Sequence, residues 1–151
     1  MPTSTPTSPP PSPRTNKVGA AIFLALGLVG FGDAAYLYFE HLRDLVPPCS
    51  KIFGCEKVLT SSFASIGHIP TALLGVFYYA LIIGGSLLFF DTKKTNVLRL
   101  LCAFTIVGLL FSIYFLILQV FVIKALCVYC LVSALTSTLL FVNGVFVYRK
   151  I

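Results

Sequence analysis

A long stretch almost without charge is the feature that most constrains this chain. Between Val97 and Val147 only Arg99 and Lys124 carry a charge. A single helix over these 51 residues would be roughly 75 Å long, more than twice the thickness of a bilayer's hydrocarbon core. A charge at the bilayer centre is disfavoured by about 2.5–3.5 kcal/mol. We therefore expect two membrane-spanning helices, at about 97–121 and 126–147, with a turn near Lys124.

Two further apolar runs precede this stretch. They extend from about Val18 to Phe39 and from Pro70 to Phe90, and each is long enough to cross a core of about 30 Å. Hydrophobic residues make up 58% of the 151 residues and charged residues 11%, and so short a chain cannot bury that much apolar surface within itself. The predicted fold class is all-α, an integral membrane bundle of four transmembrane helices.

Residues 1–16 have a different composition from the rest of the chain. They are mostly Pro, Ser and Thr, with too little apolar surface to offset the entropy lost on ordering. They also lack the charged start, short apolar stretch and cleavage site of a signal peptide. The predicted organisation is a disordered cytoplasmic tail over 1–16 and one membrane domain over 17–151.

The basic residues predict the orientation of the four spans. Four spans place both termini on the same side, and that side carries seven of the eleven Lys and Arg residues. These seven are Arg14, Lys17, Lys93, Lys94, Arg99, Arg149 and Lys150. The positive-inside rule then places both termini in the cytoplasm and the loop over 40–69 outside. Because no basic helix or stripe is present in the sequence, a nucleic-acid partner is not expected.

Four of the five cysteines fall on the predicted outer side. Cys127 and Cys130 begin the fourth span, and their spacing places both sulfurs on one helix face, close enough to bond to each other. A helix N-terminus favours the thiolate of Cys127. This pattern indicates a redox-active pair, with two small buried hydrophobic residues as the alternative. Cys102, near the cytoplasmic end of the third span, is expected to pack in the core.

Cys49 and Cys55 form a second pair, in the outer loop. Pro47, Pro48 and Gly54 around them suggest a loop that can move. Taken alone, this pair favours a structural disulfide. A zinc site made by all four outer cysteines is disfavoured, because it would have little to organise at the bilayer edge. We expect no metal.

Three segments resemble the vitamin K epoxide reductase family, and most closely its microbial members. They are residues 54–62 (GCEKVLTSS), 69–75 (IPTALLG) and 127–131 (CVYCL), and their order agrees with the predicted topology from Val18 onward. The resemblance implies a four-helix bundle around a quinone, with the outer loop as a cap. It also implies shuttle cysteines at Cys49 and Cys55, an active-site pair at Cys127 and Cys130, and a loop serine near the quinone at Ser61.

The resemblance implies a function as well. Microbial members oxidise a thioredoxin-like (DsbA-type) partner, which inserts disulfides into exported proteins, and they pass the electrons to ubiquinone, menaquinone or a related quinone. Some members carry a fused thioredoxin-like domain. Because this chain stops at Ile151, we expect a separate partner, and a location in the cell (inner) membrane with the active cysteines on its outer face. The family commonly has Gly-Ile-Pro where this chain has His68-Ile69-Pro70, so a local difference is expected there.

Further candidate residues lie in or near the spans. Asp33, inside the first span, is predicted to protonate or hydrogen-bond the quinone, or equally to make a contact between helices. Tyr129, inside the C-x-x-C motif, is the preferred aromatic contact for the quinone. His68 is more simply an incidental interfacial residue than a proton donor. Six other aromatic residues could line a quinone site, although packing explains most of them: Phe77, Tyr78, Tyr79, Phe111, Tyr114 and Phe115.

Two alternatives compete with a quinone-dependent thiol–disulfide oxidoreductase of this family. A DsbB-type thiol–quinone oxidoreductase also has four spans and two outer cysteine pairs, but its C-x-x-C motif lies in the first outer loop, so the order here is reversed. A non-catalytic four-span scaffold, with a structural disulfide in its loop, does not explain the second pair at Cys127 and Cys130.

Overall fold

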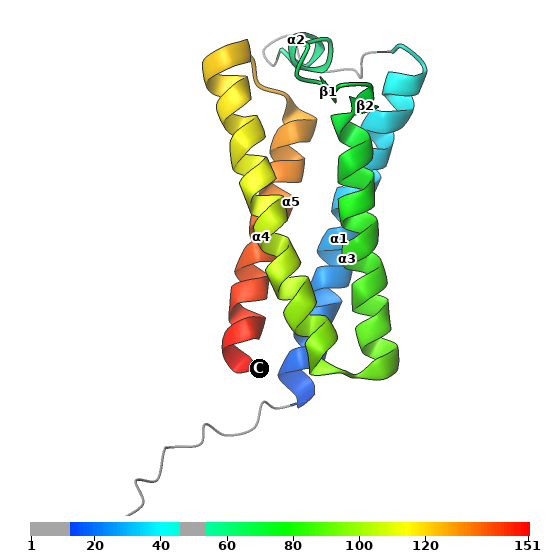
Figure 1. Cartoon of the computed structure of the whole chain (residues 1–151), viewed down its shortest axis with the longest axis vertical. Coiled ribbons are helices and arrows are strands. Elements are labelled where there is room, and N and C mark those ends of the chain that lie inside the picture. Colours follow the sequence, from blue (N-terminus) through cyan, green and yellow to red (C-terminus); the bar gives the residue numbers. More distant parts are fainter. Residues whose placement is uncertain (1–12, 46–53) are drawn as a thin grey trace, which may run out of the picture.

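Four long helices make up most of the part of the chain that the structure describes (Figure 1). The structure is a computed structural model, which describes residues 13–45 and 54–151. Each long helix is long and apolar enough to cross a membrane, so the predicted all-α bundle with four spans is confirmed. The chain is thus a multi-pass membrane protein. The helices are α1 (Pro13–Leu42), α3 (Thr71–Thr92), α4 (Thr95–Ile117), continued by the π-helix η1 (Leu118–Ile123), and α5 (Val128–Lys150).

The predicted boundaries hold best where the sequence changes abruptly. The turn expected near Lys124 is present, because Lys124 adopts the left-handed conformation directly after η1. The third span ends at Ile123, two residues later than expected. Helix α1 begins at Pro13, inside the stretch predicted to be a disordered tail, since proline is well suited to the first turn of a helix. Residues 1–12 of that tail lie outside the described residues.

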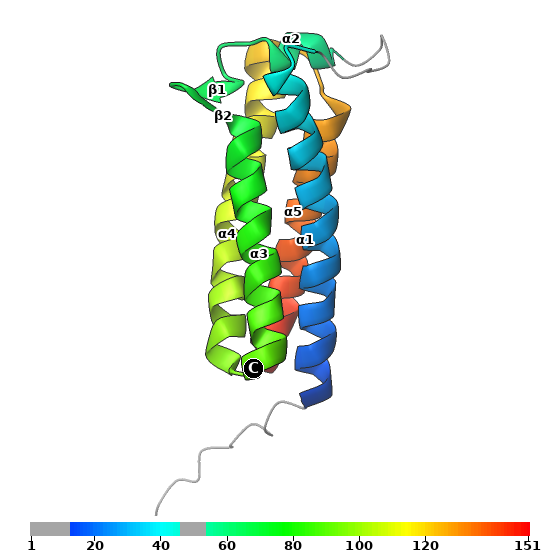
Figure 2. The ribbon, with the colours of Figure 1, turned by 90° about the vertical axis from the view of Figure 1, so that its right-hand side faces the viewer.

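The helices pack as an antiparallel bundle (Figures 1 and 2). Helix α1 packs closely against α3 and α5, and α4 packs against α5, whereas α3 and α4 touch each other much less. Phe23, Tyr79 and Leu140 are among the fully buried side chains of the central cluster. Many large apolar side chains remain exposed on the outside of the bundle, as expected for a surface that faces lipid.

A short helix and a hairpin cover one end of the bundle, as both views show (Figures 1 and 2). They are α2 (Cys55–Leu59) and the strands β1 (Ser65–Ile66) and β2 (Ile69–Pro70). The hairpin pairs Ser65 with Pro70, and Gly67 takes a positive φ of 66° in its turn. Glycine is favoured in that conformation, and His68 follows it in the turn. The start of α1 and Ile151 lie at the opposite end (Figure 1).

Candidate functional site

The C-x-x-C pair lies where the chain enters α5. Cys127 is the N-cap residue of α5 and is fully buried, while Cys130 lies in the first turn and is half-buried. Both are free thiols in this structure. The pKa of the Cys127 thiol is lowered to about 7, chiefly by a hydrogen bond from the Cys130 side chain and to a smaller extent by the N–H groups of Cys130 and Tyr129, while burial opposes them. The surroundings of Cys127 therefore favour its thiolate, in the direction expected at a helix N-terminus.

Helix α2 places Cys55 next to Cys127, in the same buried cluster. Cys55 and Cys127 are both fully buried, and together with Val58 and Ile123 they form a small hydrophobic cluster separate from the main core. Cys55 is disulfide-bonded, and Cys49, its predicted partner, lies outside the described residues. The cluster joins α2 to the segment that links η1 and α5, so one residue of each predicted pair lies in a single buried group. Cys102 lies elsewhere, in the central cluster of the bundle.

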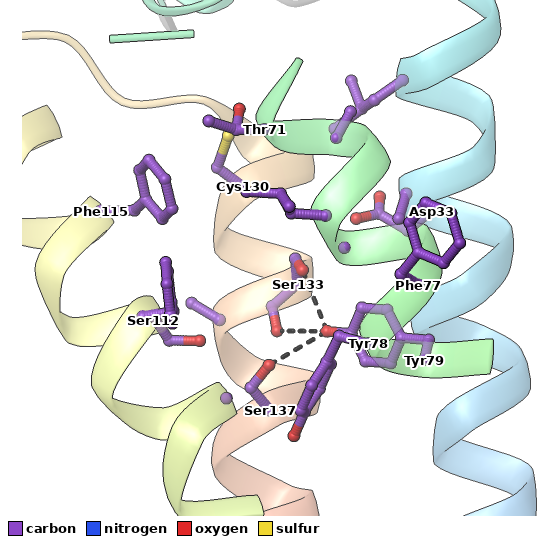
Figure 3. A pocket seen from close by; sticks show the side chains of 18 of the residues that line it. Asp33, Thr71, Phe77, Tyr78, Tyr79, Ser112, Phe115, Cys130, Ser133 and Ser137 are labelled. Carbon is purple, nitrogen blue, oxygen red and sulfur yellow. Dashed lines mark hydrogen bonds between the residues drawn. The ribbon is translucent and has the colours of Figure 1, made fainter. Parts of the chain in front are cut away.

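A cavity of about 360 Å³ lies inside the bundle beside Cys130 (Figure 3). All four long helices contribute to its lining, which is mostly apolar. Asp33 of α1 and Tyr78 of α3 reach this cavity, and their Oδ2 and hydroxyl oxygen are buried without a hydrogen-bond partner among the described residues. The cavity is therefore an apolar space beside a thiol, with two polar atoms still able to bind a partner.

A group of hydroxyls lies deeper in the cavity (Figure 3). The Tyr79 hydroxyl is 3.0 Å from the carbonyl oxygen and 3.0 Å from the side-chain oxygen of Ser133, and 3.1 Å from the Ser137 hydroxyl. The two serines are not among the site residues predicted from the sequence. Their spacing of three and seven residues from Cys130 was a signal for them, because it places all three side chains on one face of α5.

The other predicted site residues are distributed around the cavity. Ser61 lines a smaller pocket of about 40 Å³, which Cys130 also lines, and its hydroxyl donates a hydrogen bond of 2.7 Å to the Val58 carbonyl. Tyr129 is not among the residues that line either space, and its ring packs against Tyr36 with centroids 5.5 Å apart. His68 is exposed in the hairpin turn.

Five of the six other aromatic candidates line the larger cavity, and the sixth faces outward. Tyr114 is 51% exposed and is not among the lining residues. The five that line the cavity are Phe77, Tyr78, Tyr79, Phe111 and Phe115.

Comparison with protein families supports an assignment for most of the chain. Residues 21–144 match the model of the vitamin K epoxide reductase family. This region contains the central part of each of the four spans, the outer loop over residues 40–69 and both predicted cysteine pairs. No curated protein matches the sequence.

Proposed function

The chain belongs to the vitamin K epoxide reductase family, whose members are quinone-dependent thiol–disulfide oxidoreductases of membranes, and from this premise we propose that it oxidises a separate thioredoxin-like protein and passes the electrons to a quinone. One observation carries the proposal. Cys127 shares a buried cluster with Cys55, while Cys130, one turn along α5, lines the cavity. The C-x-x-C pair thus lies between the outer loop and the interior of the bundle.

The size and lining of the cavity support a quinone as its occupant. Its volume of about 360 Å³ lies within the range of small-molecule sites, which are usually apolar with a few polar groups. We propose that Asp33 and Tyr78 hold the ring, because each has a buried oxygen without a hydrogen-bond partner among the described residues. When bound, a quinone supplies an acceptor for two electrons and two protons. Contacts from Ser61 and Tyr129 remain predictions.

The proposed electron path is a series of thiol–disulfide exchanges. A thiolate of the partner attacks Cys49, which opens the Cys49–Cys55 disulfide and leaves Cys49 in a mixed disulfide with the partner. The second thiolate of the partner then displaces Cys49, so the partner leaves oxidised and Cys49 and Cys55 are both reduced. The Cys55 thiolate then attacks the sulfur of Cys127, which breaks the Cys127–Cys130 disulfide and releases Cys130 as a thiolate. Cys49 next attacks Cys55, which restores the loop disulfide and releases Cys127. A leaving thiol with a lowered pKa departs faster, so the lowered pKa of Cys127 favours this last step.

At the end of this path the loop pair is again a disulfide and the C-x-x-C pair is reduced. Two electrons then reside on Cys127 and Cys130. The Cys130 side chain is the one that lines the cavity, and we propose that Asp33, in the same lining, provides a proton there. The oxidised partner would go on to insert disulfides into exported proteins.

Quinol formation tests the proposal. A reduced thioredoxin-like protein, the purified chain and a quinone are mixed, and quinol is followed by absorbance. We expect turnover by the wild type and none by Cys127→Ala or Cys130→Ala. Cys102→Ala is the matched control and should keep wild-type turnover, because Cys102 lies in the central cluster away from the outer loop. Full turnover by either C-x-x-C variant would refute the assignment.

A further inference from the structure

A buried amide lies beside the C-x-x-C pair. Gln119, in the π-helix η1, is 3% exposed. Its side-chain oxygen Oε1 accepts a hydrogen bond of 3.0 Å from the main-chain N–H of Cys127. Its main-chain oxygen accepts hydrogen bonds from the N–H of Lys124 and, at 3.1 Å, from that of Ala125. One residue thus binds three main-chain N–H groups of the segment that leads into α5.

These hydrogen bonds satisfy main-chain N–H groups that would otherwise lack a partner. The first N–H groups of a helix and of the turn before it have no partner within the helix, and a buried N–H without a partner is costly. Residues 124–127 turn the chain sharply between two spans, and Cys127 is fully buried. The π-helical register of η1 gives the Gln119 carbonyl its bond to Lys124, five residues on. π-Helical turns are rare and are frequently found at functional sites.

We propose that Gln119 is a positioning residue, which holds the main chain of Cys127 so that its sulfur stays between Cys55 and Cys130. This inference rests on the proposed role of Cys127 in the electron path. Only an oxygen can face the N–H of Cys127, so the hydrogen bond fixes which end of the amide points toward α5. No other hydrogen bond to this N–H is present within the described residues.

The reactivity of the sulfur depends on this orientation. The groups that favour the Cys127 thiolate are the Cys130 side chain and the N–H groups of Cys130 and Tyr129, and all of them lie in the first turn of α5. They can reach the sulfur only while Cys127 keeps its extended N-cap conformation, with φ −107° and ψ 124°. When the bond from Gln119 is lost, the main chain at Cys127 can rotate and the sulfur can move away from these donors.

A change at Gln119 does not alter the other groups near the sulfur of Cys127. Asp33 of α1 acts on the Cys127 sulfur and raises its pKa, and Cys55 of α2 packs in the same cluster. Lys124 is exposed. Because Gln119 also lines the cavity, turnover alone cannot separate a positioning role from a contact with the quinone. The test therefore measures Cys127 itself, without quinone.

The experiment compares the pH dependence of Cys127 alkylation in variants of the reduced, purified full chain. Iodoacetamide is the probe, and the modified Cys127 peptide is quantified by mass spectrometry. Gln119→Met keeps the length of the side chain and removes the oxygen, so we expect the midpoint to rise by about one pH unit and the rate at pH 7 to fall about fivefold. Gln119→Asn is one methylene too short for the hydrogen bond and should shift the midpoint in the same direction.

Val120→Met is the matched control, because Val120 is the next residue and is 47% exposed on the outside of the bundle. It should keep the wild-type midpoint. If Gln119→Met does not fold, the midpoint measured for Gln119→Asn tests the positioning role. A wild-type midpoint in a folded Gln119 variant, or an equal shift in Val120→Met, would overturn the positioning role. A shift confined to the Gln119 variants supports the positioning role, whether or not the wild type forms quinol. Failure of the wild type to form quinol would contradict the proposed function and leave the positioning role standing.

Discussion

Cys127, at the N-cap of α5, has a lowered pKa with two kinds of cause. The sequence predicted a thiolate here because a helix N-terminus offers free N–H groups. In the structure the largest contribution is instead the hydrogen bond from the Cys130 side chain, and the N–H groups of Cys130 and Tyr129 contribute less. The two cysteines therefore have unequal roles, since one stabilises the thiolate of the other.

Removal of Cys130 should make Cys127 less reactive near neutral pH. In the wild type, alkylation of Cys127 should increase about tenfold per pH unit below 7 and level off above it, because only the thiolate reacts. In Cys130→Ala the main cause of the lowered pKa is lost, so the midpoint should rise toward the ordinary value of a thiol. The measurement is the rate of iodoacetamide labelling between pH 5 and pH 10 (about five units, enough to bracket both midpoints). Cys102→Ala is the control, and a midpoint near 7 in Cys130→Ala would show that the thiol of Cys130 has no such effect.

Asp33 is the residue with two competing interpretations, a proton donor to the quinone and a contact between helices. Asp33→Asn keeps a polar side chain of the same size but cannot release a proton. If Asp33 is a general acid, kcat for quinol formation should fall by about 100-fold. Gly32→Ala is the control, because an added Cβ at Gly32 meets no atom within 4 Å. An unchanged kcat and KM in Asp33→Asn would leave only the contact between helices.

At the scale of elements, the site depends on how α2 lies against the segment between η1 and α5. A Cβ added to Gly54, the N-cap residue of α2, would lie 2.7 Å from the Cβ of Ala125. Such a distance is too short for two carbon atoms, so glycine permits the close approach that brings the start of α2, and with it Cys55, to Cys127. From the sequence alone, Gly54 predicts only a loop that can move.

A change at Gly54 should therefore slow transfer between the two cysteine pairs. Gly54→Ala is expected to reduce partner-driven quinol formation roughly tenfold, which corresponds to about 1.4 kcal/mol and is typical of overpacking. Reduction of the C-x-x-C pair by a small dithiol, which bypasses α2, should be unaffected. The double variant Gly54→Ala/Ala125→Gly removes the clash and should restore the rate. An unrestored rate in the double variant would show that the contact with Ala125 is not the cause.

At the scale of the whole molecule, the four spans could be predicted because each apolar run has the length of a transmembrane helix. The turn near Lys124 followed from the cost of a charge in the membrane. The role of Gln119 could not be predicted, because its hydrogen bond to Cys127 depends on the π-helical register of η1. The position of Tyr129 could not be predicted either, since its neighbour Tyr36 belongs to a helix that is distant in the sequence.

The orientation of the bundle is a further prediction at this scale. The loop with Lys93 and Lys94 lies between α3 and α4, at the same end as Ile151 and opposite α2 (Figure 1). The positive-inside rule places that basic end in the cytoplasm. Alkaline phosphatase, which is active only outside the bacterial cytoplasm, should be active when fused after Thr60 and inactive when fused after Lys94. The reverse pattern would contradict the proposed orientation.

The central claim is that Cys55 can exchange disulfides with Cys127. The most direct test is the triple variant Cys49→Ala/Cys102→Ala/Cys130→Ala, which leaves only these two thiols. After mild oxidation, digestion and mass spectrometry, we predict a disulfide-linked pair of peptides that contain Cys55 and Cys127, formed in most molecules. If both thiols stay free and are fully alkylated after oxidation, the electron path proposed here cannot operate.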